Sequence, residues 1–195
     1  MSGTGFLEAA FAEHEALVAA SRVALATAFA RACALCAESL DAGGRILLFG
    51  NGGSAADAQH VATELMVRFE ADRRPMPAIA LTTDSSLLTA CANDLGFDQV
   101  FARQVVGLAR PGDVAIGIST SGRSRNVLLG LEAARRVGAR TIALTGAEPG
   151  ALTALCDVVF SVPSRKVARI QEIHILVLHG LCAALEAELA PGRQG

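Results

Sequence analysis

The sequence lacks an apolar run long enough to cross a membrane, although 52% of its 195 residues are hydrophobic. Charged residues interrupt every apolar stretch well before the roughly 20 residues that a bilayer span requires. The first residues, Met1 to Glu8, contain neither a basic region nor an apolar stretch, so no secretory signal is expected. These absences predict a cytoplasmic protein without a membrane partner.

An excess of positive charge is also missing. The formal net charge is −2, and lysine occurs only once, at Lys166. A protein that binds nucleic acid or an anionic membrane surface normally carries a basic patch, so neither partner is expected. Any acidic ligand must therefore be held locally by a few side chains and backbone groups.

The cysteines do not form the even-numbered set of a disulfide framework. There are five, mostly within apolar stretches: Cys33, Cys36, Cys91, Cys156 and Cys182. Cys33-x-x-Cys36 has the spacing of a redox motif, but no strand precedes it and no second pair follows. Buried thiols in a reducing compartment are the favoured interpretation.

Short apolar runs alternate with helical stretches through most of the chain. Residues 6–40 have apolar positions at helical spacing, which predicts two helices or one bent helix that ends at Gly43-Gly44. Five nearly continuous apolar runs then predict strands covered on both faces, at 45–49, 78–81, 113–118, 141–144 and 157–160. The helices expected between them are 55–69, 85–92, 99–108, 125–137 and 151–155, before a long final helix at 166–189. Alternating strands and helices indicate a parallel α/β sheet with helices on both faces.

The length of the chain favours one domain over two. The prediction is a single domain over residues 1–195. It comprises N-terminal helices (1–42), an α/β core with its closing helix (43–189) and a frayed tail (190–195).

Two polar loops follow the first and third predicted strands, where ligands bind in open parallel sheets. The first is Gly50-Asn51-Gly52-Gly53-Ser54, with Ser54 expected to cap the next helix; the second runs from Ser119 to Ser124 and contains four hydroxyls. One such loop would be no more than a turn, but two at neighbouring strands predict a phosphorylated ligand. Neither loop has the spacing of a nucleotide-binding loop, which disfavours nucleotide chemistry.

Two helices carry polar side chains that suit acid–base or metal chemistry. His60 and Glu64 are four residues apart and therefore share a helix face. The final helix carries Gln171, His174 and His179 in an apolar context, and a structural role is expected for His174. Gln171 and His179 are separated by about 12 Å of helix rise and about 80° of rotation. Either they span one site, or subunits meet there.

Several segments together resemble a known family. They are Gly50-Asn-Gly-Gly-Ser-Ala-Ala-Asp-Ala-Gln-His60, Pro77-Ala-Ile-Ala-Leu-Thr-Thr-Asp84, Ala92-Asn-Asp94, Gly117-Ile-Ser-Thr-Ser-Gly122 and Arg169-Ile-Gln-Glu-Ile-His174 with His179. They resemble the phosphoheptose isomerases, and the resemblance runs from about residue 17 to residue 189. It implies a three-layer, flavodoxin-like, five-stranded parallel sheet of the sugar-isomerase (SIS) type, with active sites between the subunits of a homotetramer. The implied reaction interconverts D-sedoheptulose 7-phosphate and D-glycero-D-manno-heptose 7-phosphate, the first step of ADP-/GDP-heptose biosynthesis.

The resemblance also implies roles for individual residues. Glu64 would be the base and His179 the acid, and one zinc ion per subunit would be bound by His60, Glu64, Gln171 and His179. The implied substrate contacts are Asn51, Gly52, Gly53, Ser54, Glu64, Asn93, Asp94, Ser119, Thr120, Ser121, Ser124 and Gln171. Ala168 departs from the aspartate that some members carry there, which leaves open a slower reaction or another preferred sugar.

Two other functions compete with the isomerase. A replication-initiator-associating protein shares the fold as a non-catalytic, tetrameric binding platform, but lacks the glutamate and the terminal histidine. A sugar-phosphate-sensing domain is less favoured, because such domains normally adjoin a DNA-binding module and the chain has no length for one. The presence of Glu64 and His179 favours the enzyme.

Overall fold

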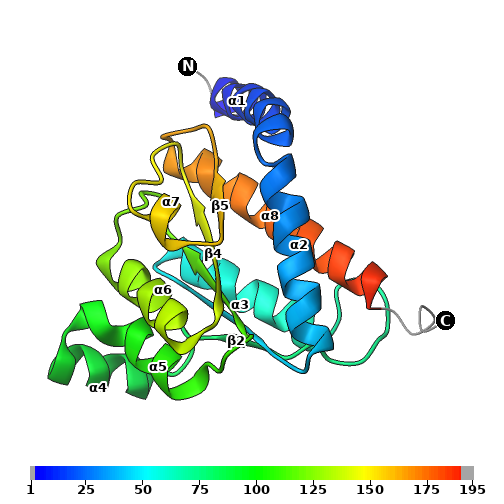
Figure 1. Ribbon diagram of the computed structural model, residues 1–195. Coiled ribbons are helices and arrows are strands. Elements are labelled where there is room, and N and C mark those ends of the chain that lie inside the picture. The colour runs from blue at the N-terminus through cyan, green and yellow to red at the C-terminus, as the bar shows by residue number, and fades with distance from the viewer. Residues whose placement is uncertain (1–2, 190–195) are drawn as a thin grey trace.

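One parallel sheet forms the centre of the molecule (Figure 1). The computed structural model describes residues 3–189, so the predicted tail at 190–195 lies outside the described residues. The strands are β1 (Ile46–Gly50), β2 (Ala78–Ala80), β3 (Val114–Ile118), β4 (Arg140–Thr145) and β5 (Val158–Ser161). Their order is β2-β1-β3-β4-β5, so the chain reverses its direction of travel across the sheet between β1 and β3. The predicted five-stranded parallel sheet is confirmed.

Helices cover both faces of this sheet. The helical elements are α1 (Gly3–Ala24), α2 (Ala26–Asp41), α3 (Gly53–Met66), α4 (Ser85–Leu95), η1 (Phe97–Gln99), α5 (Val100–Leu108), α6 (Arg125–Val137), α7 (Leu152–Leu155) and α8 (Val167–Glu188). One apolar core joins α2, α3 and α8 to the first face, and a second joins α4 to α7 to the opposite face. Every residue of β1 and of β3 is buried, as expected for strands covered on both sides.

The N-terminal segment forms two helices rather than one bent helix. α1 and α2 meet at an angle of 65° around Leu25, and only Leu17 and Ser21 of α1 are buried. α1 reaches the rest of the fold through α8: Arg169 Nη1 donates to the Ala10 carbonyl at 2.7 Å, and His14 Nδ1 lies 2.7 Å from Glu172 Oε2. The outer face of α1 leaves the large apolar side chains of Phe6, Leu7 and Phe11 exposed.

The final helix is long and apolar. Contrary to the expectation from the sequence, α8 meets the length and composition criteria for a membrane span, as does the bent pair α1 and α2 if taken together. In this fold α8 lies along the sheet with α2 and α3, and Ile173, Leu178 and Leu185 are buried in the core. A core helix of this kind satisfies the same criterion, so the hydropathy of α8 is explained by burial.

His174 has the structural role that the sequence suggests. Its side chain is fully buried, and Nε2 lies 3.2 Å from the Thr145 carbonyl at the end of β4, to which it donates as the Nε2–H tautomer. Burial lowers the pKa of His174 to about 4, and the Thr145 carbonyl offsets only part of that shift. The imidazole is therefore neutral at physiological pH, and its hydrogen bond to Thr145 joins α8 to β4 of the sheet.

All five cysteines are free thiols. Burial raises the pKa of Cys36 and Cys182 above their usual range and that of Cys156 to about 12. Thiols with raised pKa values react poorly, which agrees with the structural role expected for them.

The burial of His174 predicts a loss of stability in mild acid. Between pH 6.5 and pH 4 the unfolded chain binds a proton at this position that the folded chain does not, so the free energy of unfolding decreases as the pH falls. At pH 5 the loss is about 2 kcal/mol for a shift of this size. A His174→Gln protein, which keeps a donor for Thr145, should lose less stability than the wild type between pH 7 and pH 5 in urea unfolding at matched protein concentration. Equal losses of unfolding free energy in the two proteins would show that His174 is not the group whose protonation destabilises the fold.

Candidate active site

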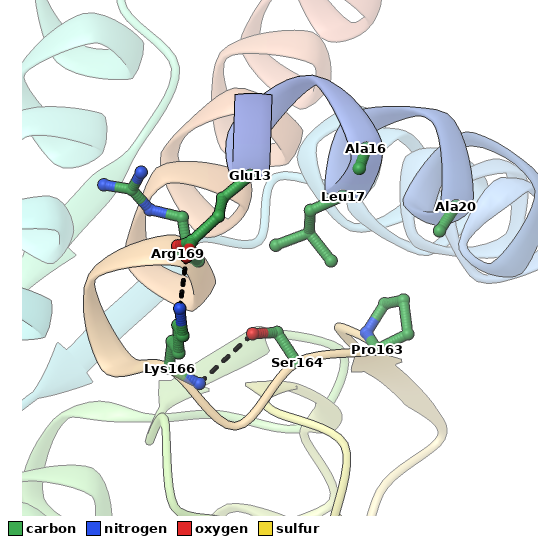
Figure 2. Close-up of a pocket in the computed structure, with 8 residues that line it drawn as sticks. All are labelled: Glu13, Ala16, Leu17, Ala20, Pro163, Ser164, Lys166 and Arg169. Atoms are coloured by element: carbon green, nitrogen blue, oxygen red, sulfur yellow. Dashed lines mark hydrogen bonds and ion pairs between the residues drawn. The ribbon is translucent and has the colours of Figure 1, made fainter. Parts of the chain in front are cut away.

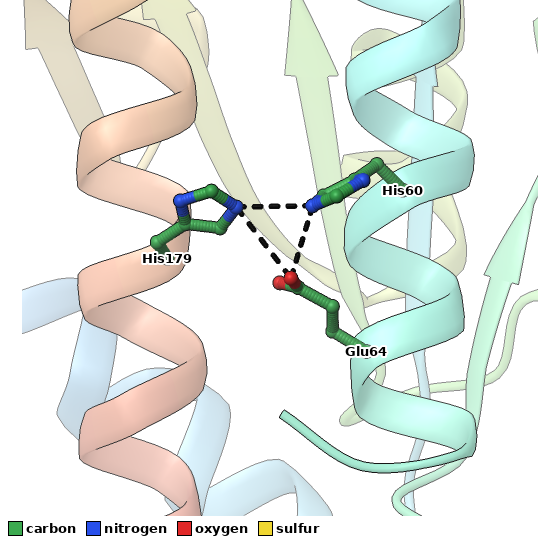
Figure 3. Close-up of side chains that lie close together, drawn as sticks. All are labelled: His60, Glu64 and His179. Carbon is green, nitrogen blue, oxygen red and sulfur yellow. Dashed lines mark hydrogen bonds and ion pairs between the residues drawn. The ribbon is translucent and has the colours of Figure 1, made fainter. Parts of the chain in front are cut away.

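His60, Glu64 and His179 converge between two helices (Figure 3). α3 supplies His60 and Glu64 from one face, and α8 supplies His179 from the facing side. His60 Nε2 lies 2.9 Å from Glu64 Oε1 and 3.0 Å from His179 Nε2, and His179 Nε2 lies 3.5 Å from the same carboxylate oxygen. The structure thus brings together three of the residues expected to act in catalysis or metal binding.

The donor set of this triad fits a zinc ion. Its three ligand atoms lie within 4.8 Å of one another, and the second carboxylate oxygen, Glu64 Oε2, is buried with no N–H or O–H donor, the Cys182 thiol of α8 being the weak donor near this carboxylate. Two imidazole nitrogens and a carboxylate form a common zinc ligand set, and three ligands leave a position for substrate or water. An unpaired buried carboxylate oxygen is costly unless it binds a cation or a proton. Within residues 3–189, these side chains are the group suited to a metal.

Further side chains contact the triad or share its helix face. The ring of Phe69, from the segment after α3, lies with its centroid 5.8 Å from that of His179. Asp57 precedes His60 by three residues, and burial raises its pKa against the opposing influence of His60 and His179. Neither residue was predicted from the sequence to belong to the site. The spacing of Asp57, His60 and Glu64 along one helix face was the available signal for Asp57.

The two predicted ligand loops lie side by side, because β1 and β3 are paired in the sheet. Asn51 from the first loop and Asn126, at the start of α6, exchange two amide hydrogen bonds of 2.9 and 2.8 Å. In the second loop, Ser119 Oγ donates to Ser124 Oγ at 2.9 Å, and Ser121 Oγ accepts from the Arg123 N–H at 3.2 Å. The hydroxyls are thus gathered at the N-terminus of α6, where a helix attracts anions.

One detail of the first loop was predicted wrongly. Ser54 does not cap α3, because the helix begins at Gly53 with Gly52 as its N-cap and without a side-chain cap. Gly52 has φ = 56°, a conformation that favours glycine and lets the chain turn into the helix two residues earlier than expected. Ser54 is instead a buried residue of the first turn.

Gln171 lies beside this loop rather than beside the triad. A Cβ atom on Gly53 would lie 2.5 Å from Gln171 Nε2, so the amide occupies the space that glycine leaves open. Gly53 and His60 are separated by about two helical turns, or about 10 Å. Gln171 therefore lies at the loop end of the contact between α3 and α8, and its role as a fourth metal ligand stays a prediction.

Asn93 and Asp94 lie near the end of α4. Asn93 Nδ2 donates to Asp94 Oδ1 at 2.8 Å, and both residues are exposed. α4 belongs to the face of the sheet opposite α3 and α8. Their predicted contact with the substrate stays a prediction.

A cavity of about 400 Å³ opens elsewhere, between α1 and the segment leading into α8 (Figure 2). Glu13, Lys166 and Arg169 supply its charged lining, and Lys166 Nζ pairs with the Glu13 carboxylate. None of the residues expected to act in catalysis, substrate binding or metal binding lines this cavity.

The class of protein follows from this fold and its loops. Residues 11–146 match the family model of the SIS domain. This match covers more than half of the chain, including β1, β3 and both polar loops.

Similar proteins identify the family within that class. The chain is 50% identical over 186 residues to a phosphoheptose isomerase from Paramagnetospirillum magneticum, covering 95% of this chain and 97% of the relative. The solved structure of a phosphoheptose isomerase from Neisseria gonorrhoeae is 42% identical with a TM-score of 0.89, covering 95% of this chain and all of that one. Another, from Francisella tularensis, is 38% identical with a TM-score of 0.92, covering 96% of this chain and all of that one. The chain belongs to the phosphoheptose isomerase family, which is a family of sugar-phosphate isomerases.

The close approach of Gly53 to Gln171 leads to a prediction about activity. Gly53→Ala should displace the Gln171 amide and lower the isomerase kcat/KM by about tenfold. The fold should persist, because Gly53 has no positive φ and alanine suits a helix. The matched control is Gly107→Ala in α5, where a Cβ atom would meet open space and kinetics should not change. Wild-type kinetics for Gly53→Ala would show that this contact does not position Gln171 for the reaction.

Proposed function

We propose that this protein interconverts D-sedoheptulose 7-phosphate and D-glycero-D-manno-heptose 7-phosphate, the first step of ADP-/GDP-heptose biosynthesis. The convergence of Glu64 and His179 from two different helices is the observation that carries the proposal. A ketose–aldose isomerase needs a base for carbon and a second group that moves protons between oxygens. Glu64 and His179 have the required chemistry within one groove.

Proton transfer through an enediol accounts for the reaction. Glu64 removes a proton from C1 of the ketose while His179 donates a proton to the C2 carbonyl oxygen, which yields the enediol. His179 then takes the proton from the C1 hydroxyl, and Glu64 returns its proton to C2, which yields the aldose. The small exposed fraction of the Glu64 side chain, 16%, supports its role as base, because water is kept from most of the carboxylate.

The two loops supply binding rather than proton transfer. We assign the phosphate to the hydroxyls and amides at the start of α6, from Ser119, Thr120, Ser121 and Ser124. We assign the sugar hydroxyls to the first loop and its neighbours, from Asn51, Gly52, Gly53, Ser54 and Gln171. Asn93 and Asp94 complete the proposed set. The amide pair between Asn51 and Asn126 supports this division, since it holds the two loops in fixed register.

We also propose one zinc ion per subunit, bound by His60, Glu64 and His179. Gln171, the fourth ligand of the proposed set, lies beside Gly53 in this structure and would have to move toward the other three to reach the ion. When bound, the ion supplies Lewis-acid polarisation of a substrate oxygen. The lack of an N–H or O–H donor to Glu64 Oε2 and the 3.0 Å separation of the two Nε2 atoms support the proposal, because a bound cation would satisfy all three side chains.

A non-catalytic binding platform is less well supported. Such a platform has no need of an acid–base pair, whereas this chain keeps both residues and places them in one groove. We place the enzyme in the cytoplasm, in agreement with its five free thiols.

The proposal predicts that Glu64→Gln lowers kcat with sedoheptulose 7-phosphate by about 10³-fold, because the amide cannot accept a proton from carbon. Glu38→Gln, on the exposed side of α2, is the matched control and should retain wild-type turnover. The same assay run with and without a chelator tests the zinc ion. A Glu64→Gln enzyme with a near-normal rate would eliminate Glu64 as the base.

We further propose a homotetramer that buries the outer face of α1. This face exposes Phe6, Leu7 and Phe11, each with more than half of its surface accessible. Large apolar side chains left exposed close together on one helix are typical of an association surface. α8 contributes Leu176, which is 50% exposed.

Sedimentation velocity at micromolar concentration should therefore give a tetramer for the wild type and a smaller species for Phe6→Asp/Phe11→Asp. The matched control is Val106→Asp, an exposed position on the opposite face of the sheet, which should remain tetrameric. A fully active wild-type monomer would contradict this proposal.

A further inference from the structure

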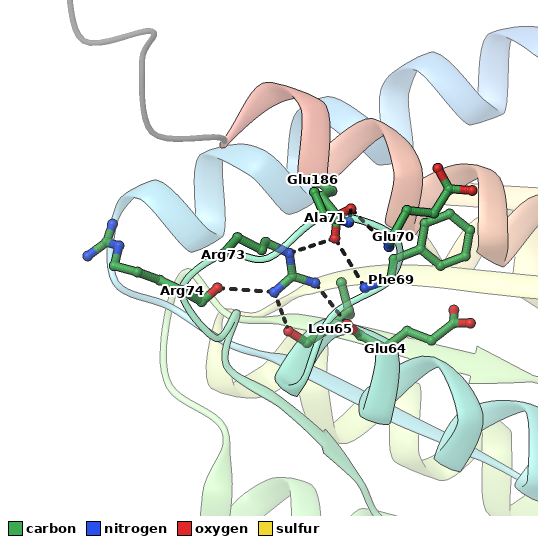
Figure 4. A network of polar contacts seen from close by, with 8 residues as sticks. All are labelled: Glu64, Leu65, Phe69, Glu70, Ala71, Arg73, Arg74 and Glu186. Carbon is green, nitrogen blue, oxygen red and sulfur yellow. Dashed lines mark hydrogen bonds and ion pairs between the residues drawn. The ribbon is translucent and has the colours of Figure 1, made fainter.

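A buried ion pair lies two helical turns beyond His179 on α8 (Figure 4). The side chains of Glu186 and Arg73 are 8% and 3% exposed, and Arg73 Nε donates to Glu186 Oε2 at 3.0 Å. Glu186 also accepts three backbone N–H groups from the segment after α3: Phe69 at 3.1 Å, Glu70 at 3.0 Å, and Ala71. Burial alone would raise the pKa of Glu186, but these donors together lower it below its usual range. The Glu186 carboxylate is therefore charged, and both of its oxygens accept hydrogen bonds.

Arg73 directs the rest of its guanidinium to the end of α3. Nη2 donates to the Glu64 carbonyl at 2.8 Å, and Nη1 donates to the carbonyls of Leu65 at 2.8 Å and Arg74 at 3.0 Å. The last carbonyls of a helix have no partner within the helix, and a cation there also interacts favourably with the helix dipole. Arg73 thus caps the turn of α3 that carries Glu64.

Arg73 and Glu186 each contact a segment that carries part of the triad His60, Glu64 and His179 or packs against it. Arg73 holds the backbone of Glu64, and Glu186 holds the backbone of Phe69, whose ring lies against His179. Glu186 itself belongs to α8, as His179 does. One ion pair therefore joins the helix of Glu64, the segment of Phe69 and the helix of His179, and it does so from outside the groove.

We propose that Arg73 and Glu186 are positioning residues that fix the separation of Glu64 and His179 and the place of Phe69 against His179. A buried ion pair seldom stabilises a fold more than well-packed apolar residues of the same size would. Its particular contribution is geometric, because every donor and acceptor must stay in place for the charges to remain satisfied. The kinetic part of this inference rests on the proposed isomerase activity.

The kinetic test uses Glu186→Gln and Arg73→Lys. Both should lower kcat by about tenfold, because displaced positioning groups misalign the acid and the base. KM should change by less than about twofold, because the phosphate loops are untouched. The matched controls are Glu188→Gln on α8 and Arg74→Lys, both exposed, which should retain wild-type kinetics. Measurements are made well below each variant's unfolding temperature, so that lost stability is not read as lost turnover.

A second measurement does not depend on activity. With ¹³C-labelled histidine in the full-length protein, the His179 ring resonance should move in Glu186→Gln and Arg73→Lys, because the ring of Phe69 shifts relative to it. The His174 resonance, from a ring bonded to Thr145, should stay unchanged. If the proposed reaction is wrong, the wild type is inactive and this measurement still decides the inference.

Folded variants with wild-type kcat and an unmoved His179 resonance would overturn the proposal, even if they unfold at a lower temperature. A rise in KM without loss of kcat would do the same, since it would place the effect in substrate binding. If Glu186→Gln does not fold, Arg73→Lys alone decides, because it keeps the charge while losing the fixed geometry of the guanidinium.

Discussion

The packing of α3 against α8 is the contact on which the site depends. α3 follows β1 directly and α8 is the last helix, so the residues that meet across the groove are more than a hundred positions apart in sequence. At one end of the groove, Gly53 permits the Gln171 amide to approach the first turn of α3. At the other end, Glu186 and Arg73 join the two helices through the segment between them. The triad lies between these two fixed ends, so its geometry is set by the packing of two rigid elements.

The sheet adds a second constraint, which concerns the loops. Because β1 and β3 are parallel neighbours, the loops after these strands open at the same edge with no strand between them, at the point where the strand order reverses. The amide pair of Asn51 and Asn126 then joins them directly. A polar connection between two neighbouring loops keeps their backbone N–H groups aimed at one space, which suits a ligand with a phosphate at one end and hydroxyls along its length.

Local patterns were enough to predict most of the fold. The apolar runs of β1 and β3 are buried at every residue, and the predicted helix at 125–137 has the observed bounds of α6. The shared face of His60 and Glu64 also follows from spacing alone. A prediction failed where backbone conformation sets the start of a helix: the positive φ of Gly52 starts α3 before Ser54 can act as a cap.

Tertiary contacts account for what the sequence did not predict. The facing position of His179 came from family resemblance, since no local pattern relates residue 179 to residue 64. Arg73 and Glu186 look like ordinary surface residues in the sequence, and only the fold shows that they form an ion pair across 113 positions. The contact of Phe69 with His179 is equally invisible to local patterns. Asn126 was likewise overlooked, because its partner Asn51 is 75 residues away.

The start of α8 faces two directions at once. Arg169 and Glu172 hold α1 through Ala10 and His14, while Gln171, between them, reaches the opposite way to Gly53. A helix turns as a rigid body, so a rotation of α8 that changes its contacts with α1 also changes the contact of Gln171 with Gly53. If α1 is the surface through which subunits associate, substrate affinity and subunit affinity are linked quantities, and each must change the other by the same factor. The enzyme would then bind its substrate more tightly, or less tightly, as its own concentration rises.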